Sequence, residues 1–336
     1  MPSVTHRSTA SRFVLTRRLL LATSACLAFA ASAPAWAQAW PGKQPVRLVA
    51  VFPPGGSVDQ VARVLATALQ QSLGQTVVVE NKGGASGAIG TGEVARAAAD
   101  GYTFAVVFDT HGVNPSLQPG IAFDTRKDLA TVAMLGTSAM VISAHAGLPY
   151  QDFKQVVADT KGGKSLTYGT IGNGSLGHLA MTLLAKSGGM DLVHVPYRGG
   201  GPLMQDAIAG HVPLSIGSVF VARPHIDSKR IRALAVTTSQ RAASLPEVPT
   251  LAELGFQGFD APAWWAVLAP ARTPPEIVQR MNAEINKALQ SPDVASKLAA
   301  QGITVNIGTP AAAQAFVERQ IDTWAKVVKD NGIKAD

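Results

Sequence analysis

The stretch VRLVAVFPPGGSVDQVARVLATALQQSLG, residues 46–74, holds a short apolar run, a glycine turn and an amphipathic segment in that order. Residues 46–51 have the length and composition of a buried strand, and the apolar residues after the turn recur at helical spacing. Ser57 precedes Gln60 by three residues, which predicts a capping box with Ser57 as the N-cap. A β-branched strand over residues 76–79 and the glycine loop NKGGASGAIG, residues 81–90, follow. The stretch therefore predicts a strand–helix–strand unit.

A second unit with the same order begins at Leu166. The strand candidate 166–171 leads into the turn GNGS, residues 172–175, and then into the helical segment HLAMTLLAKSGG. A strand over 192–195 and the glycine-containing PYRGG complete this unit. Ser57 and Ser175 are 118 positions apart, close to the offset of 116 between the two later glycine pairs. The repeat predicts two similar α/β domains.

The remaining segments continue this α/β pattern. Strands are predicted over 102–108, 212–216 and 231–237, and the pair Trp264-Trp265 is typical of strand packing. Asn114-Pro115 predicts a turn. A helix is predicted over 153–160. Three more are predicted after the N-cap residues Thr273, Ser291 and Thr309, the first of them with Pro274 at N1 and Glu276 at N3. Asn331-Gly332 ends the last helix.

The N-terminus has the pattern of an export signal. Four arginines precede the apolar run 19–31, and Ala35-Trp36-Ala37 is a small-x-small cleavage site, so we expect a mature chain from Gln38. Arg17-Arg18 also resembles a twin-arginine signal, but the pattern is loose and Sec export is favoured over Tat. No second apolar run approaches the length of a membrane span. The expected location is the periplasm.

Composition narrows the possible functions. The full chain has 29 Lys and Arg against 22 Asp and Glu; without the four signal arginines the ratio is 25 to 22. This weak surplus, without a basic cluster, argues against nucleic acid as a partner. The single cysteine, Cys26, lies in the signal, so the expected mature chain has neither a disulfide nor a zinc–thiolate site.

The turn GNGSLG, residues 172–177, has three interpretations. It fits the G-x-G-x-x-G dinucleotide fingerprint, but the following strand ends without the acidic residue that binds the ribose. It is close to a G-x-S-x-G nucleophile elbow, but Asn173 stands where glycine is required. It also fits a helix N-terminus that binds an anion through backbone N–H groups. The duplication favours the last interpretation, because two such termini, one per domain, would face each other across a cleft and grip a molecule with a carboxylate at each end.

The chain resembles Bug-type periplasmic receptors, the solute-binding components of tripartite tricarboxylate transporters. The resemblance rests on residues 47–104 and on successive blocks that include HGVNPSL, GNGSLGHLA, LVHVPYRGG, PHIDSKRIRALAVTT, LPEVPTLAELG and WWAVLAPARTPPEIV. It covers essentially the whole expected mature chain. It implies an α/β fold with two domains, the type II periplasmic-binding-protein or Venus-flytrap fold, in which two segments cross between the domains.

The resemblance also implies boundaries and ligand loops. Domain 1 is expected over residues 38–135 and 268–336 and domain 2 over 136–267, with crossings near 132–143 and 262–270. The residues that match the ligand loops of the family are Phe52, Gly55, Gly56, Ser57, Asp59, Ala85, Ser86, Asp109, Thr110, His111, Thr170, Gly174, Ser175, His178, Tyr197 and Ser218. Asp59 and His178 also have ordinary structural interpretations, as a first-turn carboxylate and as a buried histidine.

Two positions depart from the pattern of the family. Asp109 stands where Ser, Thr or Gly is common, and an acid is unexpected beside a bound carboxylate. Asp109 could cap the next turn, be neutralised by His111 or an arginine, or pair with a cationic nitrogen of the ligand. Gly217 and Ser218 replace bulkier polar residues and leave space near Phe220. Both departures argue against citrate as the ligand.

The function that the resemblance implies is binding without catalysis or a cofactor. The expected receptor is a monomer that captures a di-, amino- or aromatic carboxylate and delivers it to the membrane permease of a tripartite transporter. The alternatives are a secreted NADP- or serine-dependent enzyme and a ligand-sensing subunit of a signalling system. Sequence alone leaves open which carboxylate binds and whether the receptor serves uptake, sensing or both.

Overall fold

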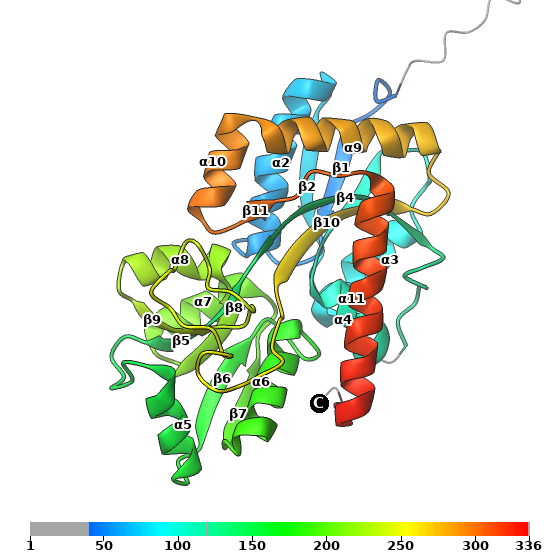
Figure 1. Ribbon diagram of the computed structural model, residues 1–336. Helices are drawn as coiled ribbons and strands as arrows, with labels where there is room; N and C mark the ends of the chain where they lie inside the picture. Colours follow the sequence, from blue (N-terminus) through cyan, green and yellow to red (C-terminus); the bar gives the residue numbers. More distant parts are fainter. Residues whose placement is uncertain (1–39, 119, 335–336) are drawn as a thin grey trace, which may run out of the picture. The chain divides into compact units, whose positions relative to one another are not determined.

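The computed structural model of the chain describes residues 40–118 and 120–334 (Figure 1). The chain separates into two units, Met1–Lys43 and Gln44–Asp336, and all described helices and strands belong to the second unit. The predicted export signal, residues 1–37, lies outside the described residues. No helix in the described part is long and apolar enough to cross a membrane.

Six strands form the first sheet, in the order β2-β1-β3-β10-β4-β11. β1 is parallel to β2 and β3, whereas β10 is antiparallel to both β3 and β4. All residues of β3 are buried, as is typical of a central strand with both faces covered. The strands are β1 (Val46–Ala50), β2 (Val77–Asn81), β3 (Thr103–Phe108), β4 (Leu129–Ser138), β10 (Ala263–Pro270) and β11 (Thr304–Val305).

The second sheet repeats this arrangement with five strands, in the order β7-β6-β8-β5-β9. β6 is parallel to β7 and β8, and β5 is antiparallel to β8 and β9. In both sheets the first strand of the repeated unit therefore lies between two parallel neighbours, so the predicted duplication is confirmed. The strands are β5 (Met140–His145), β6 (Leu166–Thr170), β7 (Leu192–Pro196), β8 (Leu214–Ser218) and β9 (Ile231–Val236).

Helices connect and cover the strands of each sheet (Figure 1). Those that pack with the first sheet are α2 (Ser57–Leu73), α3 (Ala88–Ala95), α4 (Thr110–Leu117), α9 (Pro275–Gln290), α10 (Pro292–Ala300) and α11 (Pro310–Asn331). Those in the segment that builds the second sheet are α5 (Phe153–Lys161), α6 (Leu176–Gly188), α7 (Gly200–Ala209) and α8 (Val219–Asp227). A short 3₁₀ helix, η1 (Ala85–Gly87), precedes α3.

Two segments link the sheets. Ala139 alone separates β4 of the first sheet from β5 of the second, and residues 237–262 return the chain from β9 to β10. Trp264 and Trp265 are fully buried on β10, as the sequence predicted, and their rings point to opposite faces because side chains alternate along a strand. Trp264 meets Phe316 of α11 with ring centroids 5.7 Å apart. Trp265 meets Phe108 at the end of β3, at 5.0 Å.

Several predicted helix termini are confirmed. Ser175 is the N-cap of α6, and its hydroxyl accepts a hydrogen bond from the His178 amide. Ser291 and Thr309 cap α10 and α11 in the same way. Gly332 ends α11 in a left-handed conformation, which glycine adopts without a steric penalty.

Two predicted caps are wrong. Gly56, and not Ser57, is the N-cap of α2, and the Gln60 side chain donates to the Gly55 carbonyl instead of closing a capping box. α9 begins at Pro275 with Pro274 at the N-cap position, so the buried Thr273 hydroxyl caps nothing. In each case the glycine or proline next to the serine or threonine takes the N-cap position, so α2 starts one residue earlier and α9 one residue later than the side-chain signal suggests.

The turn predicted at Asn114-Pro115 is also wrong, because both residues lie inside α4. Pro115 is the sixth residue of this eight-residue helix, so only a short C-terminal part follows it. The Asn114 side-chain amide donates to the Ser86 carbonyl at 3.0 Å and ties α4 to η1. A tertiary hydrogen bond thus outweighs the local turn preference.

Candidate functional site

The candidate site forms where the strand order reverses in each sheet. β1 lies between β2, which follows it through α2, and β3 on its opposite edge. The carboxyl ends of β1 and β3 therefore form a topological switch point. β6 and β8 form the same arrangement in the second sheet. Open α/β sheets bind ligands at such points. The segments that follow these four strands carry most of the predicted site residues.

A small cavity, which we call the inner cavity, lies among these segments. It leaves about 10 Å³ free for the centre of a water molecule. Its walls come from both sheets and their helices, and none of the lining residues is charged. They are Phe52, Gly56, Ser57, Val58, Phe108, Met140, Ile171, Gly200, Gly217, Ser218 and Val221.

Three helix N-termini contribute to the wall of the inner cavity. α2 begins after Gly56, α7 after Gly199 and α8 after Ser218, and none of these N-cap residues caps its helix through a side chain. The first N–H groups of a helix have no partner within the helix, and the helix dipole adds roughly half a positive charge at this end. The cavity therefore offers backbone donors and positive potential without a cationic side chain, which suits a carboxylate.

Ser218 adds a hydroxyl that no described group contacts. Its Oγ atom is buried and has no hydrogen-bond partner, although Ser218 occupies the N-cap position of α8. Buried hydroxyls are almost always hydrogen-bonded in native proteins, so such an atom beside a cavity indicates a ligand-binding group. Ser57, in the first turn of α2, lines the same cavity and is 7% exposed.

A row of aromatic rings forms the other side of the inner cavity. Phe52 and Phe108 meet edge to face, with centroids 6.3 Å apart and planes at 87°. Phe108 also contacts Trp265, and Trp265 contacts Phe220 of α8 at 5.9 Å. The row joins residues of the first sheet to a helix of the second.

A larger opening, which we call the outer groove, lies beside the inner cavity. Its volume is about 950 Å³, and Ile171 is the residue that lines both spaces. The exposed Arg198 also lines it. The other lining residues are Pro53, Pro54, Asn81, Gly83, Gly84, Ala85, Ser86, Ile89, Gln118, Gly172, Asn173, Pro196 and Tyr197.

Among the contacts between loops of the two sheets, two involve residues that line the outer groove or the inner cavity. The Asn173 carbonyl accepts hydrogen bonds from Ser86 Oγ at 2.6 Å and from Gln118 Nε2 at 3.1 Å. Gly56 and Gly200 also approach closely, since a Cβ atom on Gly56 would lie 3.5 Å from the Gly200 nitrogen. Each contact involves a turn that follows the first strand of a repeat: the turn after β6 contains Asn173, and the turn after β1 contains Gly56.

The turn after β6 is stabilised by its own side chains. The Gly174 amide donates to His178 Nδ1, and the Ser175 hydroxyl accepts from the His178 amide. Thr170 Oγ1 bonds the Gly172 backbone and lies 2.7 Å from His194 Nε2, while the rings of His178 and His194 stack at 4.0 Å. The hydroxyl that the nucleophile-elbow interpretation requires thus serves as a helix cap.

Asp59 has a structural role in the first turn of α2. Its buried carboxylate accepts from the Gly55 amide at 3.0 Å and from Arg63 Nε at 2.9 Å. Burial by itself raises the pKa of Asp59, but the hydrogen bonds from Arg63, Gly55 and Asn81 outweigh burial and lower this pKa below its ordinary value. Asp59 therefore stays ionised and fixes the turn that leads into the helix.

Asp109 is fully buried at the start of α4, and its side chain does not cap the helix. Neither carboxyl oxygen has a hydrogen-bond partner among the described residues. Burial raises the pKa of Asp109 well above its ordinary value, and the nearby Thr110 amide opposes this only in part because it lies outside hydrogen-bonding geometry. Burial also lowers the pKa of His111 to about 4. His111 is therefore neutral near pH 7 and supplies no positive charge to Asp109.

The segment around η1 and the residue Tyr197 shape the outer groove. Ala85 and Ser86 both have positive φ angles, 45° and 50°, which are uncommon for residues other than glycine. Tyr197 donates to Asp206 Oδ2 at 2.9 Å, and burial together with this bond raises the pKa of Tyr197 to about 12. Tyr197 is thus a neutral, oriented wall residue.

The structure distributes the predicted residues over three environments. Phe52, Gly56, Ser57 and Ser218 line the inner cavity, and Ala85, Ser86 and Tyr197 line the outer groove. The others line neither of these two spaces: Gly55 is exposed, and the remaining ones are buried, namely Asp59, Asp109, Thr110, His111, Thr170, Gly174, Ser175 and His178.

Sequence reasoning missed three residues of the inner cavity that lie outside the predicted ligand loops: Phe108, Met140 and Val221. Val58, Ile171 and Gly200, which also line it, lie within those loops, over 52–59, 170–178 and 197–200. Phe108 is the last residue of β3 and Met140 the first of β5, so a search limited to polar loop residues passes over them. Val221 lies in the first turn of α8, just after the predicted Ser218. In the described part of the chain, no group of three or more His, Cys, Asp and Glu residues is arranged to hold a metal ion.

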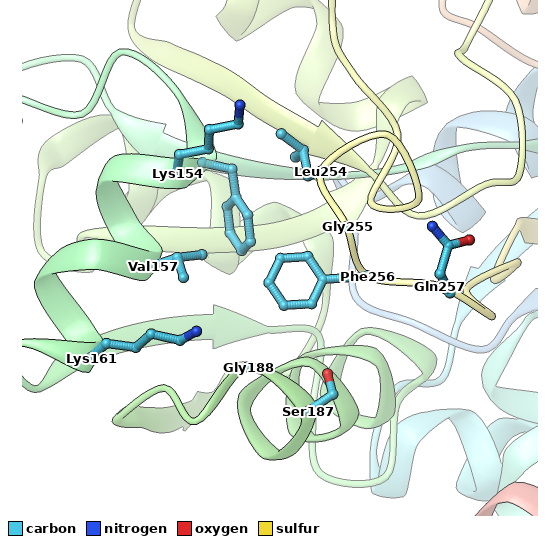
Figure 2. Close-up of a pocket in the computed structure, with 10 residues that line it drawn as sticks. Lys154, Val157, Lys161, Ser187, Gly188, Leu254, Gly255, Phe256 and Gln257 are labelled. Atoms are coloured by element: carbon cyan, nitrogen blue, oxygen red, sulfur yellow. The ribbon is translucent and has the colours of Figure 1, made fainter.

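Another cavity lies away from the switch points, between α5, the end of α6 and the loop before β10 (Figure 2). Phe153 and Phe256 meet edge to face at its base, with centroids 6.1 Å apart. Figure 2 shows Lys154 and Lys161 on α5 beside it. It contains no residue of the predicted site.

Comparison with known proteins identifies the family. Residues 61–333 match the model of the tripartite tricarboxylate transporter family receptor, TctC. The chain belongs to this family. The receptor is 39% identical to Protein BugT of Bordetella pertussis over 306 residues, which cover 90% of the receptor and 94% of BugT.

Solved structures agree with this assignment. The structure titled periplasmic binding protein BugD is similar with a TM-score of 0.84 at 32% identity, and the match covers 88% of the receptor and 99% of that chain. The structure of R. palustris Rpa4515 with adipate gives a TM-score of 0.84 at 34% identity, with the same coverage. The receptor therefore has the two-domain periplasmic-binding-protein fold, and its family is one of periplasmic solute-binding receptors.

Proposed function

We propose that the receptor binds a small carboxylate between its two domains, with the carboxylate group in the inner cavity. One observation carries this proposal: the N-termini of α2, α7 and α8 line a single cavity without side-chain caps. Each terminus supplies N–H donors and partial positive charge, and together they favour a negative charge in the cavity. Rpa4515, a relative with adipate bound, supports a carboxylate as the ligand class.

The proposal includes a domain movement. The inner cavity in this structure is too small for a carboxylate, so entry requires the close pair Gly56 and Gly200 to separate. We place the domain boundaries near residues 135 and 268, within β4 and β10. Two long strands would then pass between the domains and flex when the cleft opens. A ligand that contacts both domains favours the closed form by its difference in affinity for the two forms.

Capture of the ligand is proposed to be followed by delivery to a membrane permease of a tripartite transporter, after export through a Sec-type signal cleaved before Gln38. The receptor would then act as a monomer without a catalytic step. Sensing for a signalling system is the second candidate role. Loss of carboxylate uptake in a deletion strain would support transport, whereas normal uptake with a lost transcriptional response would support sensing.

Binding is tested by thermal unfolding and calorimetry with carboxylates and their neutral amides. A carboxylate held at 100 times its Kd should stabilise the receptor by about 2.7 kcal/mol. The matched amide has the same shape without the charge and should give little or no shift. Equal shifts for acids and amides would contradict the proposal, because the helix termini would then not select an anion. NADPH serves as the control for the enzyme interpretation and should not bind.

A further inference from the structure

Polar and apolar groups both line the inner cavity. The polar part consists of the helix starts at Gly56 and Gly200 and the hydroxyls of Ser57 and Ser218. The apolar part, which we call the apolar side, consists of Phe52, Val58, Phe108, Met140, Ile171 and Val221. A ligand that satisfies both parts has one polar, anionic end and an apolar body.

Charge limits the number of carboxylates that the cavity can accept. No lysine, arginine or histidine lines it, so the positive potential comes from helix N-termini alone. These termini suit a single carboxylate. A second carboxylate against the apolar side would lose its hydration without gaining a partner, which is unfavourable for a charged group. Asp109, next to Phe108 in the chain, is buried without a partner and would add no positive charge for the second group.

Aromatic contacts make the apolar side suitable for a ring or a branched chain. Phe52 and Phe108 line the cavity and form an edge-to-face pair, Phe108 packs against Trp265, and Trp265 packs against Phe220. Aromatic groups favour edge-to-face or offset packing against such rings.

Gly217 widens the cavity next to these rings. A Cβ atom at this position would meet only Val221 Cγ1, at 3.7 Å, which is an ordinary contact. The backbone of Gly217 does not have a positive φ angle, so neither conformation nor crowding requires glycine here. The missing side chain leaves space for the ligand, and an alanine would occupy part of this space without distorting β8.

We propose that the inner cavity selects monocarboxylates with an apolar aromatic or aliphatic body over dicarboxylates of the same length. This inference rests on the proposed function and narrows its ligand class. Dicarboxylates have one other route: a long ligand could pass Ile171 into the outer groove and bring its second carboxylate to Arg198.

Matched ligand pairs test the inference by calorimetry. Hexanoate and adipate share a six-carbon chain, and benzoate and benzene-1,4-dicarboxylate share a ring; each pair differs by one carboxylate. We expect each monocarboxylate to bind at least about tenfold more tightly than its dicarboxylate partner. Hexanamide and benzamide serve as neutral controls. If neither acid binds better than its amide, the proposed function itself fails.

Two variants keep the experiment specific. Gly217→Ala should weaken benzoate binding by about tenfold, the effect of one misplaced methyl group in an apolar pocket. Gly308→Ala is the control, since its new methyl group also meets its nearest neighbour at 3.7 Å but lies before α11, outside the cavity. Equal benzoate affinity in both variants would overturn the inference. Tighter binding of adipate than of hexanoate would also overturn it. If Arg198→Gln then lost the preference for adipate, the second carboxylate would be assigned to the outer groove.

Discussion

At the scale of single residues, two serines at equivalent helix positions have opposite hydrogen-bond environments. Ser175 and Ser218 are the N-caps of α6 and α8, and both are buried. The Ser175 hydroxyl accepts from the His178 amide, whereas the Ser218 hydroxyl has no partner and lines the inner cavity. The same residue type therefore stabilises the fold at one position and is available to a ligand at the other.

This contrast predicts opposite effects of two alanine substitutions. Ser175→Ala should lower the free energy of unfolding by about 1 kcal/mol, because α6 loses its cap. Ser218→Ala should leave the unfolding free energy nearly unchanged and weaken carboxylate binding by about 1.5–3 kcal/mol, the contribution of a hydrogen bond to a charged group. Chemical denaturation and calorimetry on both variants measure the two quantities. A loss of stability in Ser218→Ala with unchanged affinity would assign a capping role to Ser218.

Asp109 predicts a pH dependence of stability with a definite sign. Burial raises the pKa of Asp109 in the folded protein well above its ordinary value of 3.8, so the folded state retains a proton that the unfolded chain releases. The contribution of Asp109 to stability is therefore fully present below pH 3.8 and is lost as pH rises toward the folded pKa. Asp109→Asn keeps the shape without the titration. The variant should become more stable relative to wild type as pH increases from 4 to 8.

Chemical denaturation of the wild type and of Asp109→Asn from pH 4 to 8 measures the difference between their unfolding free energies. A constant difference would mean that Asp109 does not titrate in this window.

Measuring the affinities of aspartate and succinate tests the other role considered for Asp109, which is pairing with a cationic nitrogen of the ligand. An ammonium group near the carboxyl would favour its ionised form, so aspartate should bind better than succinate only if Asp109 contacts the ligand. Equal affinities would leave Asp109 as a buried, protonated part of the loop.

At the scale of elements, the sequence predicts the strands and helices whose burial imposes clear periodicity, but it gives no strand for β4, β5 and β11 and no helix for α3, α4, α7 and α8. The run 46–51 and the repeat beginning at Leu166 become β1 and β6, each with parallel neighbours on both sides. Helix starts are predicted less well. Ser57 and Thr273 have the residue types of N-caps, but the adjacent Gly56 and Pro274 take that position. A capping signal in the sequence does not show which of two neighbouring residues adopts the non-helical conformation of the N-cap.

The candidate site was also predicted only in part. The sequence identifies the loops after β1, β3, β6 and β8, because glycine turns and helix starts mark them. It does not identify Phe108, Met140 and Val221, because apolar residues at the ends of strands look like ordinary core. Only the packing of the segments that follow the strands of the two sheets shows that these side chains face a cavity. The proposed ligand class rests on these three residues as well as on the polar loop residues.

At the scale of the whole receptor, two separate contacts hold the domains together around the cavity: the hydrogen bonds to the Asn173 carbonyl and the approach of α7 to the turn before α2. Gly201 lies in the second contact. A Cβ atom there would be 2.9 Å from the Pro54 carbonyl oxygen, closer than real Cβ atoms approach backbone. Within helix α7 itself, alanine is about 1 kcal/mol more favourable than glycine.

Gly201→Ala should therefore hinder closure without weakening either domain. Small-angle scattering of the wild type should show a smaller radius of gyration at saturating ligand than without ligand, because the bound carboxylate favours the closed form. The variant should show a smaller decrease, a weaker affinity and an unchanged or higher unfolding free energy. Gly308→Ala, which adds a methyl group away from the contact, should behave as the wild type in scattering and affinity. An equal decrease in wild type and Gly201→Ala would show that closure does not bring α7 against Pro54, and no decrease in wild type would argue against domain closure on binding.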